Sequence, residues 1–395
     1  MRIHTRATSL LLLALLAACA DQPVTPAARE AGRSLAAAKA CAESPAFVVH
    51  TDPELRVALA AAGSGDVIAI SGNVALDSIV TVTTEGVTLT CAEPGAGLSL
   101  APGNEFGLLL DLWVGHVTIS GLVLDAEYGY AAVTAVTVDE AGLPHIRLTA
   151  NEIDCGYTFC IFVVGVPYLE VTDNHFKGDE TRFGVQIQGS PIPQPGGGYP
   201  LMPGIVVSRN VIENEEGYLG QYGGIRLRDG RDATITHNQI LGSWSGGVTL
   251  TNVYDSRVEH NRIDGVLRDG IDFLLVSARR ISASGVSVKA NQITNVGRAG
   301  ISVRGACWNT FEGNNVGDNP VGARFEPSTG DNVYRGVHEI VQDGGAFDCD
   351  LDGDIDPNRI SGVQSRPLPD TVPGPAQSLG AVPVTRGGRS FPAAQ

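Results

Sequence analysis

Alternating aspartates near the C-terminal end form the most specific chemical pattern in the sequence. The pattern consists of Asp348, Asp350, Asp352, Asp354 and Asp356, with Gly353 at the sixth position of the segment. A tight turn at the glycine lets the carboxylates at positions one, three, five and nine converge on one hard cation. Residues 341–361 are therefore predicted to be an acidic loop that binds Ca²⁺, and the alternative is an acidic linker.

The spacing of these aspartates resembles the calcium loops of dockerins, EF-hands and thrombospondin type 3 repeats. The twelfth position differs, because Arg359 stands where an EF-hand has a bidentate Glu. We therefore expect weak binding, in the range of extracellular modules, with a Kd of about 10⁻⁴ to 10⁻³ M.

The first residues are typical of an export signal. Arg2 and Arg6 precede an apolar run at residues 10–18 that is too short to span a bilayer. Residues 16–19 read Leu-Ala-Ala-Cys, which resembles the lipobox of a bacterial lipoprotein. The resemblance implies removal of residues 1–18 and lipidation of Cys19. Ordinary signal cleavage beside an incidental Cys is the alternative.

On this interpretation, residues 19–45 form a flexible tether, and the protein is anchored in the bacterial cell envelope, at the outer membrane or the cell surface. The chain has 43 Asp+Glu against 27 Lys+Arg, which gives a formal net charge of −16. That balance argues against nucleic acid as a partner and against general attraction to anionic membranes. Contact with a membrane is expected through the lipid alone.

The other six cysteines are an even number in an exported chain, which predicts disulfides. They are Cys41, Cys91, Cys155, Cys160, Cys307 and Cys349. Their number alone allows fifteen different pairings, so it leaves the connectivity open.

A repeated phrase runs between residues 147 and 320: alternating apolar residues, an Asn, any residue, then Ile, Phe or Val. Its asparagines are Asn151, Asn174, Asn210, Asn238, Asn261, Asn291 and Asn314. The shortest spacing is 23 residues, and longer spacings add insertions. A second phrase, a Gly followed by an apolar residue, comes after most of these asparagines, as in Gly224-Ile225 and Gly270-Ile271.

Short period-two strands separated by Gly and Asn turns predict a parallel β-solenoid, whose rungs stack about 4.8 Å apart. Helical repeats are longer and need helix-forming residues, which these units lack. Asn suits such a turn because it tolerates the left-handed region and hydrogen-bonds locally. Stacked asparagines would form a ladder that satisfies buried amide groups.

The repeats resemble the right-handed parallel β-helix family, which includes pectate lyases and many bacterial surface proteins. The resemblance implies an all-β fold: a single-stranded parallel β-helix of about ten rungs over residues 46–340, with an N-terminal capping helix. Thr51 or Asp52 can cap this helix, Pro53 suits its first turn, and Leu55 and Leu59 share one face. Residues 362–395 lack periodicity and are predicted to be a disordered tail.

The rungs also suggest the disulfide pairing. Cys155 and Cys160 fall in one rung, which predicts a bond across one turn. Cys307 with Cys349, and Cys41 with Cys91, would then each tie an end segment to the solenoid.

In the enzymes of this family, the strand after the Gly-apolar phrase lines the substrate groove. Carried over by position, the outward residues are Gln186, Gln188, Arg226, Arg228, Thr249, Thr251, Asp272, Ser302, Arg304, Arg324 and Glu326. Period two places Arg226, Thr249 and Asp272 on successive rungs, within about 10 Å of one another. The largest insertions, at residues 190–203, 213–222 and 276–285, lie beside this strand, which favours it as the binding face.

We therefore expect the face to recognise, and as a further step to cleave, a polysaccharide. The candidate catalytic residues are Arg226, Arg228, Asp269 and Asp272. The candidate substrate-binding residues are Gln186, Gln188, Tyr222, Trp244, Thr249 and Arg304, with Tyr222 and Trp244 as sugar-stacking rings. Asp269 and Asp272 could act as the paired acids of a glycoside hydrolase, and an Arg beside Asp272 as the base of a polysaccharide lyase.

The family's polygalacturonase and epimerase motifs are absent from the sequence. His237 and His260 each precede a ladder Asn and are expected to be stacked, solvated turn residues away from the groove. The alternative function is a non-catalytic surface or adhesion protein, in which the solenoid is a rigid spacer with an ordinary polar exterior.

Overall fold

The computed structural model describes residues 41–103, 107–127, 129–137, 142–178, 181–189, 200–214, 223–242, 244–274, 283–326, 329–336, 340–342, 349 and 357–361. Several predictions concern residues outside this set: the signal at 1–18, Cys19, nearly all of the tether, Tyr222, most of the three inserted loops and the tail at 362–395. The five aspartates of the predicted calcium loop lie outside it as well.

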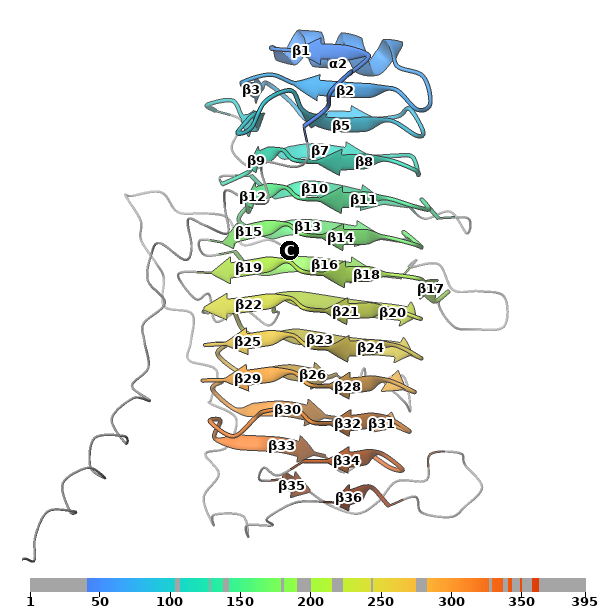
Figure 1. The fold of residues 1–395 in the computed structure, drawn as a ribbon, viewed down its shortest axis with the longest axis vertical. Coiled ribbons are helices and arrows are strands. Elements are labelled where there is room, and N and C mark those ends of the chain that lie inside the picture. The colour runs from blue at the N-terminus through green and yellow to red at the C-terminus, as the bar shows by residue number, and fades with distance from the viewer. Residues whose placement is uncertain are drawn as a thin grey trace, which may run out of the picture.

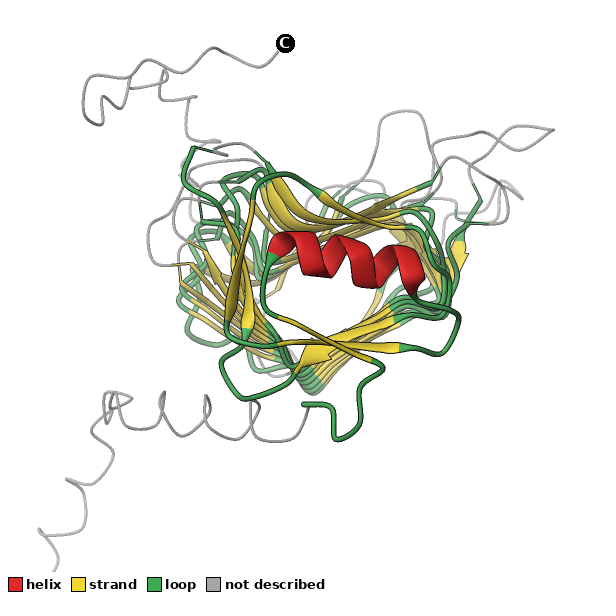
Figure 2. Cartoon of the chain, turned by 90° about the horizontal axis from the view of Figure 1, so that it is seen from above, coloured by secondary structure: helices red, strands yellow, loops and turns green. Residues whose placement is uncertain are grey.

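The chain winds into a column of coils whose strands form three parallel sheets along the column (Figure 1). Seen from above, the sheets lie on three sides of a closed cross-section (Figure 2). Each strand pairs with the equivalent strand of the coils before and after it, for example Val206–Ser208 with Glu170–Thr172 and Thr234–Thr236. This arrangement confirms the predicted parallel β-helix.

The first sheet contains thirteen strands of the described chain, against the ten or so rungs predicted. They are β1 (Phe47–Val49), β2 (Val67–Ile70), β5 (Thr88–Cys91), β8 (Thr118–Ser120), β11 (Arg147–Thr149), β14 (Glu170–Thr172), β18 (Val206–Ser208), β21 (Thr234–Thr236), β24 (Arg257–Glu259), β28 (Ser287–Lys289), β32 (Thr310–Glu312), β34 (Val333–Arg335) and β36 (Arg359–Ser361).

The second sheet is made of β3 (Asn73–Leu76), β6 (Gly97–Leu100), β9 (Val123–Asp125), β12 (Glu152–Asp154), β15 (His175–Gly178), β19 (Val211–Asn214), β22 (Gln239–Gly242), β25 (Arg262–Asp264) and β29 (Gln292–Thr294).

The third sheet, which carries the candidate site, is made of β4 (Val80–Val82), β7 (Leu108–Leu112), β10 (Ala131–Val136), β13 (Phe159–Val164), β16 (Phe183–Gln188), β20 (Ile225–Arg231), β23 (Val248–Tyr254), β26 (Ile271–Phe273), β30 (Ala299–Val303), β33 (Val321–Phe325) and β35 (Ile340–Gln342). Three short strands pair beside this path: β17 (Met202–Pro203), β27 (Ala283–Ser284) and β31 (Ala306–Cys307).

The predicted asparagine ladder runs through the interior of one turn. The side-chain oxygen of Asn210 accepts the backbone N–H and the side-chain amide of Asn174, each at 3.0 Å, and Asn210 donates in turn to Val171 and Asn238. Burying such groups without partners would cost about 1–3 kcal/mol each. The left-handed residue is the one before each Asn, such as Arg209 (φ 56°), and not the Asn itself. The asparagines are therefore selected for their hydrogen bonds rather than for a left-handed backbone.

A second, shorter ladder of Asn309, Asn332 and Asn358 occupies another turn and was missed in the sequence. Asn358 leads into β36, which pairs with β34. The solenoid therefore continues past the predicted boundary at residue 340, because Arg359–Ser361 adds one more strand to the first sheet.

The predicted capping helix is α2 (Asp52–Ala61), which lies across the open end of the first coil (Figure 2). The Thr51 hydroxyl accepts the N–H of Glu54 at 3.4 Å, and Pro53 occupies the first turn. Leu55 and Leu59 are buried against the first coil, as the pattern predicts. The helix thus seals the apolar interior from solvent.

All three predicted disulfides are present: Cys41–Cys91, Cys155–Cys160 and Cys307–Cys349. Their Cα atoms are 4.5, 4.3 and 6.0 Å apart, distances that a disulfide can bridge. The first bond fixes the chain before β1 to β5, and the second closes the turn that leads into β13.

Candidate functional site

The outward side of the third sheet carries one continuous column of side chains in register. In chain order it consists of Asp111, Thr134, Phe162, Gln186, Arg226, Thr249, Asp272, Ser302 and Arg324. We call it the register column. Arg226, Thr249 and Asp272 lie on successive rungs, as predicted. Since rungs are about 4.8 Å apart, the column forms a long polar and aromatic strip.

Asp272 forms a two-pronged ion pair with Arg304. The Arg304 Nη2 atom lies 2.9 and 2.7 Å from the two carboxylate oxygens of Asp272. The Asp272 side chain is 14% exposed and that of Arg304 is 21% exposed. Burial raises the pKa of Asp272, the Arg304 guanidinium opposes that rise, and the nearby Asp269 carboxylate adds to it. Asp272 pairs in register with Ser302 on the next rung, and Arg304, predicted only as a substrate-binding residue, reaches back from that rung.

Asp269 is paired with Arg298, a residue that the sequence analysis did not single out. Arg298 donates from Nε to one carboxylate oxygen at 2.8 Å and from Nη2 to the other. The Asp269 side chain is 3% exposed. Arg298 stands two residues before Gly300, as Arg268 stands before Gly270, so aligning the repeats could have placed it beside Asp269. Both predicted acids are thus engaged by guanidinium groups.

The other predicted polar residues also lie on this side of the sheet. Arg228 is 3.3 Å from the buried carboxylate of Asp229, which also accepts the side-chain amide of Asn252 at 2.6 Å. Gln188 pairs in register with Arg228 and is half-buried. Gln186 and Thr249 are each 8% exposed, so they are less accessible than predicted.

Among the buried amide and hydroxyl oxygens on this side, Gln186 Oε1, Thr251 Oγ1 and Ser302 Oγ have no hydrogen-bond partner in the described part of the chain. They lie on the outward side of the sheet rather than in its aliphatic interior. Such atoms can form hydrogen bonds with the hydroxyl groups of a ligand or with water.

Trp244 does not belong to the site. Its ring was predicted to stack on a sugar, but the side chain is 1% exposed and its Nε1 donates to the Ile212 carbonyl at 3.3 Å. Trp244 follows the end of β22 and turns inward, where its large apolar ring fills the core. The other predicted ring, Tyr222, lies outside the described residues.

An aromatic cluster, missed in the sequence, adjoins the register column on β13 and β16. Phe159 stacks against Phe162 and Phe183, each at a centroid distance of 4.7 Å, and Tyr130 meets Phe159 edge-on at 5.3 Å. Phe159 and Phe183 pack with Ala131 in a cluster separate from the main core. The signal was available, because the rung of Cys160 carries Phe on both sides of its Cys-Ile pair.

His237 and His260 stack at 5.1 Å on a different turn, and both are exposed, as expected for solvated turn residues. His116, His145 and Tyr168 form a similar exposed stack with centroid distances of 4.8 and 4.9 Å. The described residues contain no group of three or more His, Cys, Asp or Glu side chains placed to hold a metal ion.

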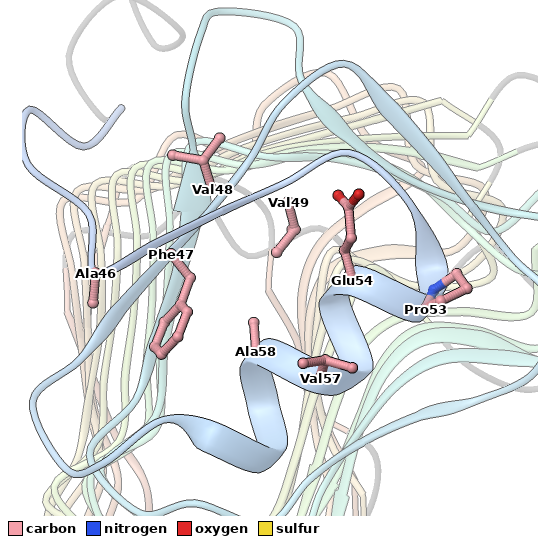
Figure 3. A pocket seen from close by; sticks show the side chains of 8 residues that line it. All are labelled: Ala46, Phe47, Val48, Val49, Pro53, Glu54, Val57 and Ala58. Atoms are coloured by element: carbon pink, nitrogen blue, oxygen red, sulfur yellow. The ribbon is translucent and has the colours of Figure 1, made fainter.

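A separate, open surface pocket of about 500 Å³ lies at the N-terminal end between β1 and α2 (Figure 3). Apolar side chains such as Phe47, Val49 and Val57 line most of it, with Glu54 at one side. It offers little polar chemistry and lies far from the charged residues of the third sheet. Within the described part of the chain, no helix has the length and apolar character required to cross a membrane.

Comparison with known proteins agrees with the architecture. Residues 159–340 match the family model described as right handed beta helix region. The match and the three stacked parallel sheets agree on the fold, a right-handed parallel β-helix. No curated protein matches the sequence.

Among solved structures, the chain is similar to a DFA-IIIase from Arthrobacter chlorophenolicus A6 in complex with GF2, with 10% identity and a TM-score of 0.47 over 84% of this chain and 91% of the other. It is similar to the alginate lyase AlyF-OU02 in complex with G6, with 12% identity and a TM-score of 0.46 over 82% and 84%. The Dettilon tailspike protein gives 12% identity and a TM-score of 0.40 over 74% of this chain and 64% of the tailspike chain, just under two thirds of its length. These likenesses concern the fold alone.

Proposed function

We propose that the outward side of the third sheet binds an extended polysaccharide. The observation that carries the proposal is the register column itself, in which aromatic, amide, guanidinium, hydroxyl and carboxylate groups succeed one another at one residue per rung. A polymer of hydroxyl-rich rings presents a matching series of donors, acceptors and apolar ring faces. An ordinary solvated exterior has no need to bury Gln186 Oε1 and Ser302 Oγ without partners.

Electrostatics support the same face. The rungs from β20 to β33 carry Arg226, Arg228, Arg298, Arg304 and Arg324 on a chain whose formal net charge is −16. Three of these arginines are paired there with Asp229, Asp269 and Asp272. A guanidinium presents a planar fork of donors that suits a uronate carboxylate or a pair of hydroxyls. The face therefore favours an acidic or neutral glycan over a basic one.

The direct test is a glycan array followed by titration of each hit. Arg226→Ala should weaken binding about tenfold, which is the loss of about 1.4 kcal/mol from one charged hydrogen bond. Arg209→Ala is the matched control, because Arg209 is paired with Asp173 on a turn away from this face. Equal affinities for both variants would reject the face. An array without a hit would reject glycan binding and support the alternative function, in which the solenoid is a rigid spacer.

Cleavage is a second candidate, favoured by the different surroundings of the two acids. Hydrolysis by this type of site needs one protonated carboxyl and one carboxylate. Burial raises the pKa of Asp272 against the opposing charge of Arg304, which contacts both of its oxygens, and the neighbouring Asp269 charge adds to the rise. Asp269 lies deeper, with both oxygens engaged by Arg298. Asp272 would then be the acid and Asp269 the base. A product assay on any bound glycan tests this, and Asp272→Asn should abolish product without abolishing binding.

The placement of the protein in the cell is part of the proposal. We infer that the chain is exported and held in the cell envelope by a lipid on Cys19, on the strength of the Leu-Ala-Ala-Cys motif. Cys19→Ala should move the protein from the membrane fraction to the soluble fraction. A variant that stayed with membranes would point to ordinary signal cleavage and another means of attachment.

Calcium binding by the aspartates at 348–356 also remains a proposal, supported by their spacing. Binding to the folded state should raise the melting temperature as calcium enters the millimolar range. Asp350→Asn with Asp352→Asn should remove that shift. A melting temperature that stays the same with and without millimolar calcium would identify the segment as an acidic linker.

A further inference from the structure

Trp113, directly after β7, is exposed and yet held in place. Its side chain is 62% exposed, the second highest value among the large exposed hydrophobic residues of the described chain. Its Nε1 donates to the Asp111 carboxylate at 2.7 Å, which folds the indole back along its own strand. The other Asp111 oxygen accepts the Thr134 hydroxyl at 2.8 Å, so the next rung holds Asp111 in turn.

The indole lies on the same side of the sheet as the proposed glycan site. Leu110 and Leu112 are buried in the interior, so Asp111 and Trp113 alternate with them and point outward. Asp111 is itself a member of the register column, through its pairing with Thr134. Val136, next to Trp113 on the following rung, is 45% exposed and widens the apolar surface.

The distance between Trp113 and Arg226 along the register column sets a minimum length for the ligand. Trp113 is on the rung of β7, and Arg226 is on the rung of β20, four steps further along. At about 4.8 Å per step, the two sites are about 19 Å apart. A ligand that reaches both must be a chain of several sugars, and a disaccharide cannot.

We propose that Trp113, positioned by Asp111, is a stacking platform for a neutral sugar at the remote end of the glycan site. The inference rests on the proposed function and sharpens it. The flat indole suits the apolar face of a pyranose ring. The Asp111 carboxylate beside it accepts sugar hydroxyls but repels a uronate. The ligand is therefore an extended chain that places a neutral residue at Trp113.

The test uses the full mature chain and two size-graded probes: neutral xylo-oligosaccharides and acidic oligogalacturonates, each of two to eight residues. Wild-type affinity should rise with length. Trp113→Ala should lower the affinity for the longest chains of the preferred series about fivefold to tenfold, and leave disaccharide binding unchanged. Trp113→Phe should recover part of the loss. The matched control is Trp308→Ala, since Trp308 is 39% exposed but lies on a turn beside the first sheet.

Fluorescence gives a second measurement. Trp244 is buried, so in a Trp308→Phe background the accessible indole is that of Trp113. Long oligosaccharides should protect it from acrylamide quenching. Unchanged long-chain affinity in Trp113→Ala, or an equal loss for short and long chains, would overturn the platform and leave the proposed function standing. No binding by the wild-type chain to either series would overturn both.

Discussion

The outward side of the third sheet has two ends that are built on the same backbone but stabilised differently. At the aromatic end, Phe159 is held by ring contacts with Phe162 on its own strand and with Phe183 on the next rung. At the charged end, Asp269 and Asp272 are nearly buried and each is paired with an Arg from the next rung. Parallel stacking at about 4.8 Å suits both, because it brings like rings into contact and also lets a long Arg reach back one rung.

The difference shows where each end is vulnerable. Ring contacts involve no net charge, so a deletion costs the packing of the removed atoms and the cavity that they leave. A buried ion pair depends on both partners, because the charge that remains after a deletion has lost its water and its counter-charge. The charged end should therefore respond more strongly to single substitutions, and it should respond to pH in the acidic range.

The largest effect is expected from Arg298→Ala. The variant leaves the Asp269 carboxylate, 3% exposed, without its counter-charge, and should lower the free energy of unfolding by about 3–5 kcal/mol. Urea denaturation measures the change. The double variant Asp269→Ala with Arg298→Ala should recover much of the loss, because no buried charge remains. A single variant within about 1 kcal/mol of wild type would mean that the pair is solvated.

Phe159→Ala should have the next largest effect. It removes the ring shared by the contacts with Phe162, Phe183 and Tyr130, and should cost about 3 kcal/mol, the lower end of the range for buried Phe, because the cluster lies at the surface. Phe159→Leu is the control and should cost less than about 1.5 kcal/mol. Unlike that of Arg298→Ala, the loss should be the same at low and high salt. A strong salt dependence would contradict the comparison.

Removing the Cys155–Cys160 bond should have a smaller effect on the aromatic end. Its partners are five residues apart, so the bond restricts the unfolded chain only modestly, by about 2 kcal/mol. Replacing both cysteines by Ala and comparing thermal unfolding measures this cost. A much larger loss would show that the bond also positions Phe159, which directly precedes Cys160.

Much of the fold was predictable because each rung of a solenoid repeats the same local sequence pattern. The ladder asparagines, the period-two strands and the cap at Thr51 each follow from local patterns, and together they place Arg226, Thr249 and Asp272 on one side. The C-terminal end of the solenoid was not predictable in this way. β36 lies at the end of the segment predicted to be an acidic loop, and its Asn358-Arg359-Ile360 carries the Asn-any-Ile part of the repeat phrase directly after that acidic stretch.

The partners within the site were harder to predict. Period two states which side a residue occupies, but not how far a long side chain reaches, so the contacts of Arg298 and Arg304 with the rung before them were missed. Trp244 was misplaced for a related reason, since a residue in a turn can point either way and its large ring gains most by burial. Trp113 was overlooked because its strand precedes the asparagine repeats.

The smallest expected effect is the pH dependence that comes from Asp272. Burial raises the pKa of this carboxyl in the folded state above its value of about 3.9 in the unfolded chain. Its contribution to stability should be complete below that value and be lost as the pH rises through the folded pKa. Asp272→Asn does not titrate, so the stability of wild type relative to this variant should fall as the pH rises above about 4, with a slope no steeper than about 1.4 kcal/mol per pH unit. Phe162→Leu, at the aromatic end, should show no such trend relative to wild type. If wild type instead gains on Asp272→Asn as the pH rises, the Arg304 guanidinium outweighs burial, Asp272 is held as a carboxylate, and the charged end can bind a glycan but cannot supply the proton that cleavage requires.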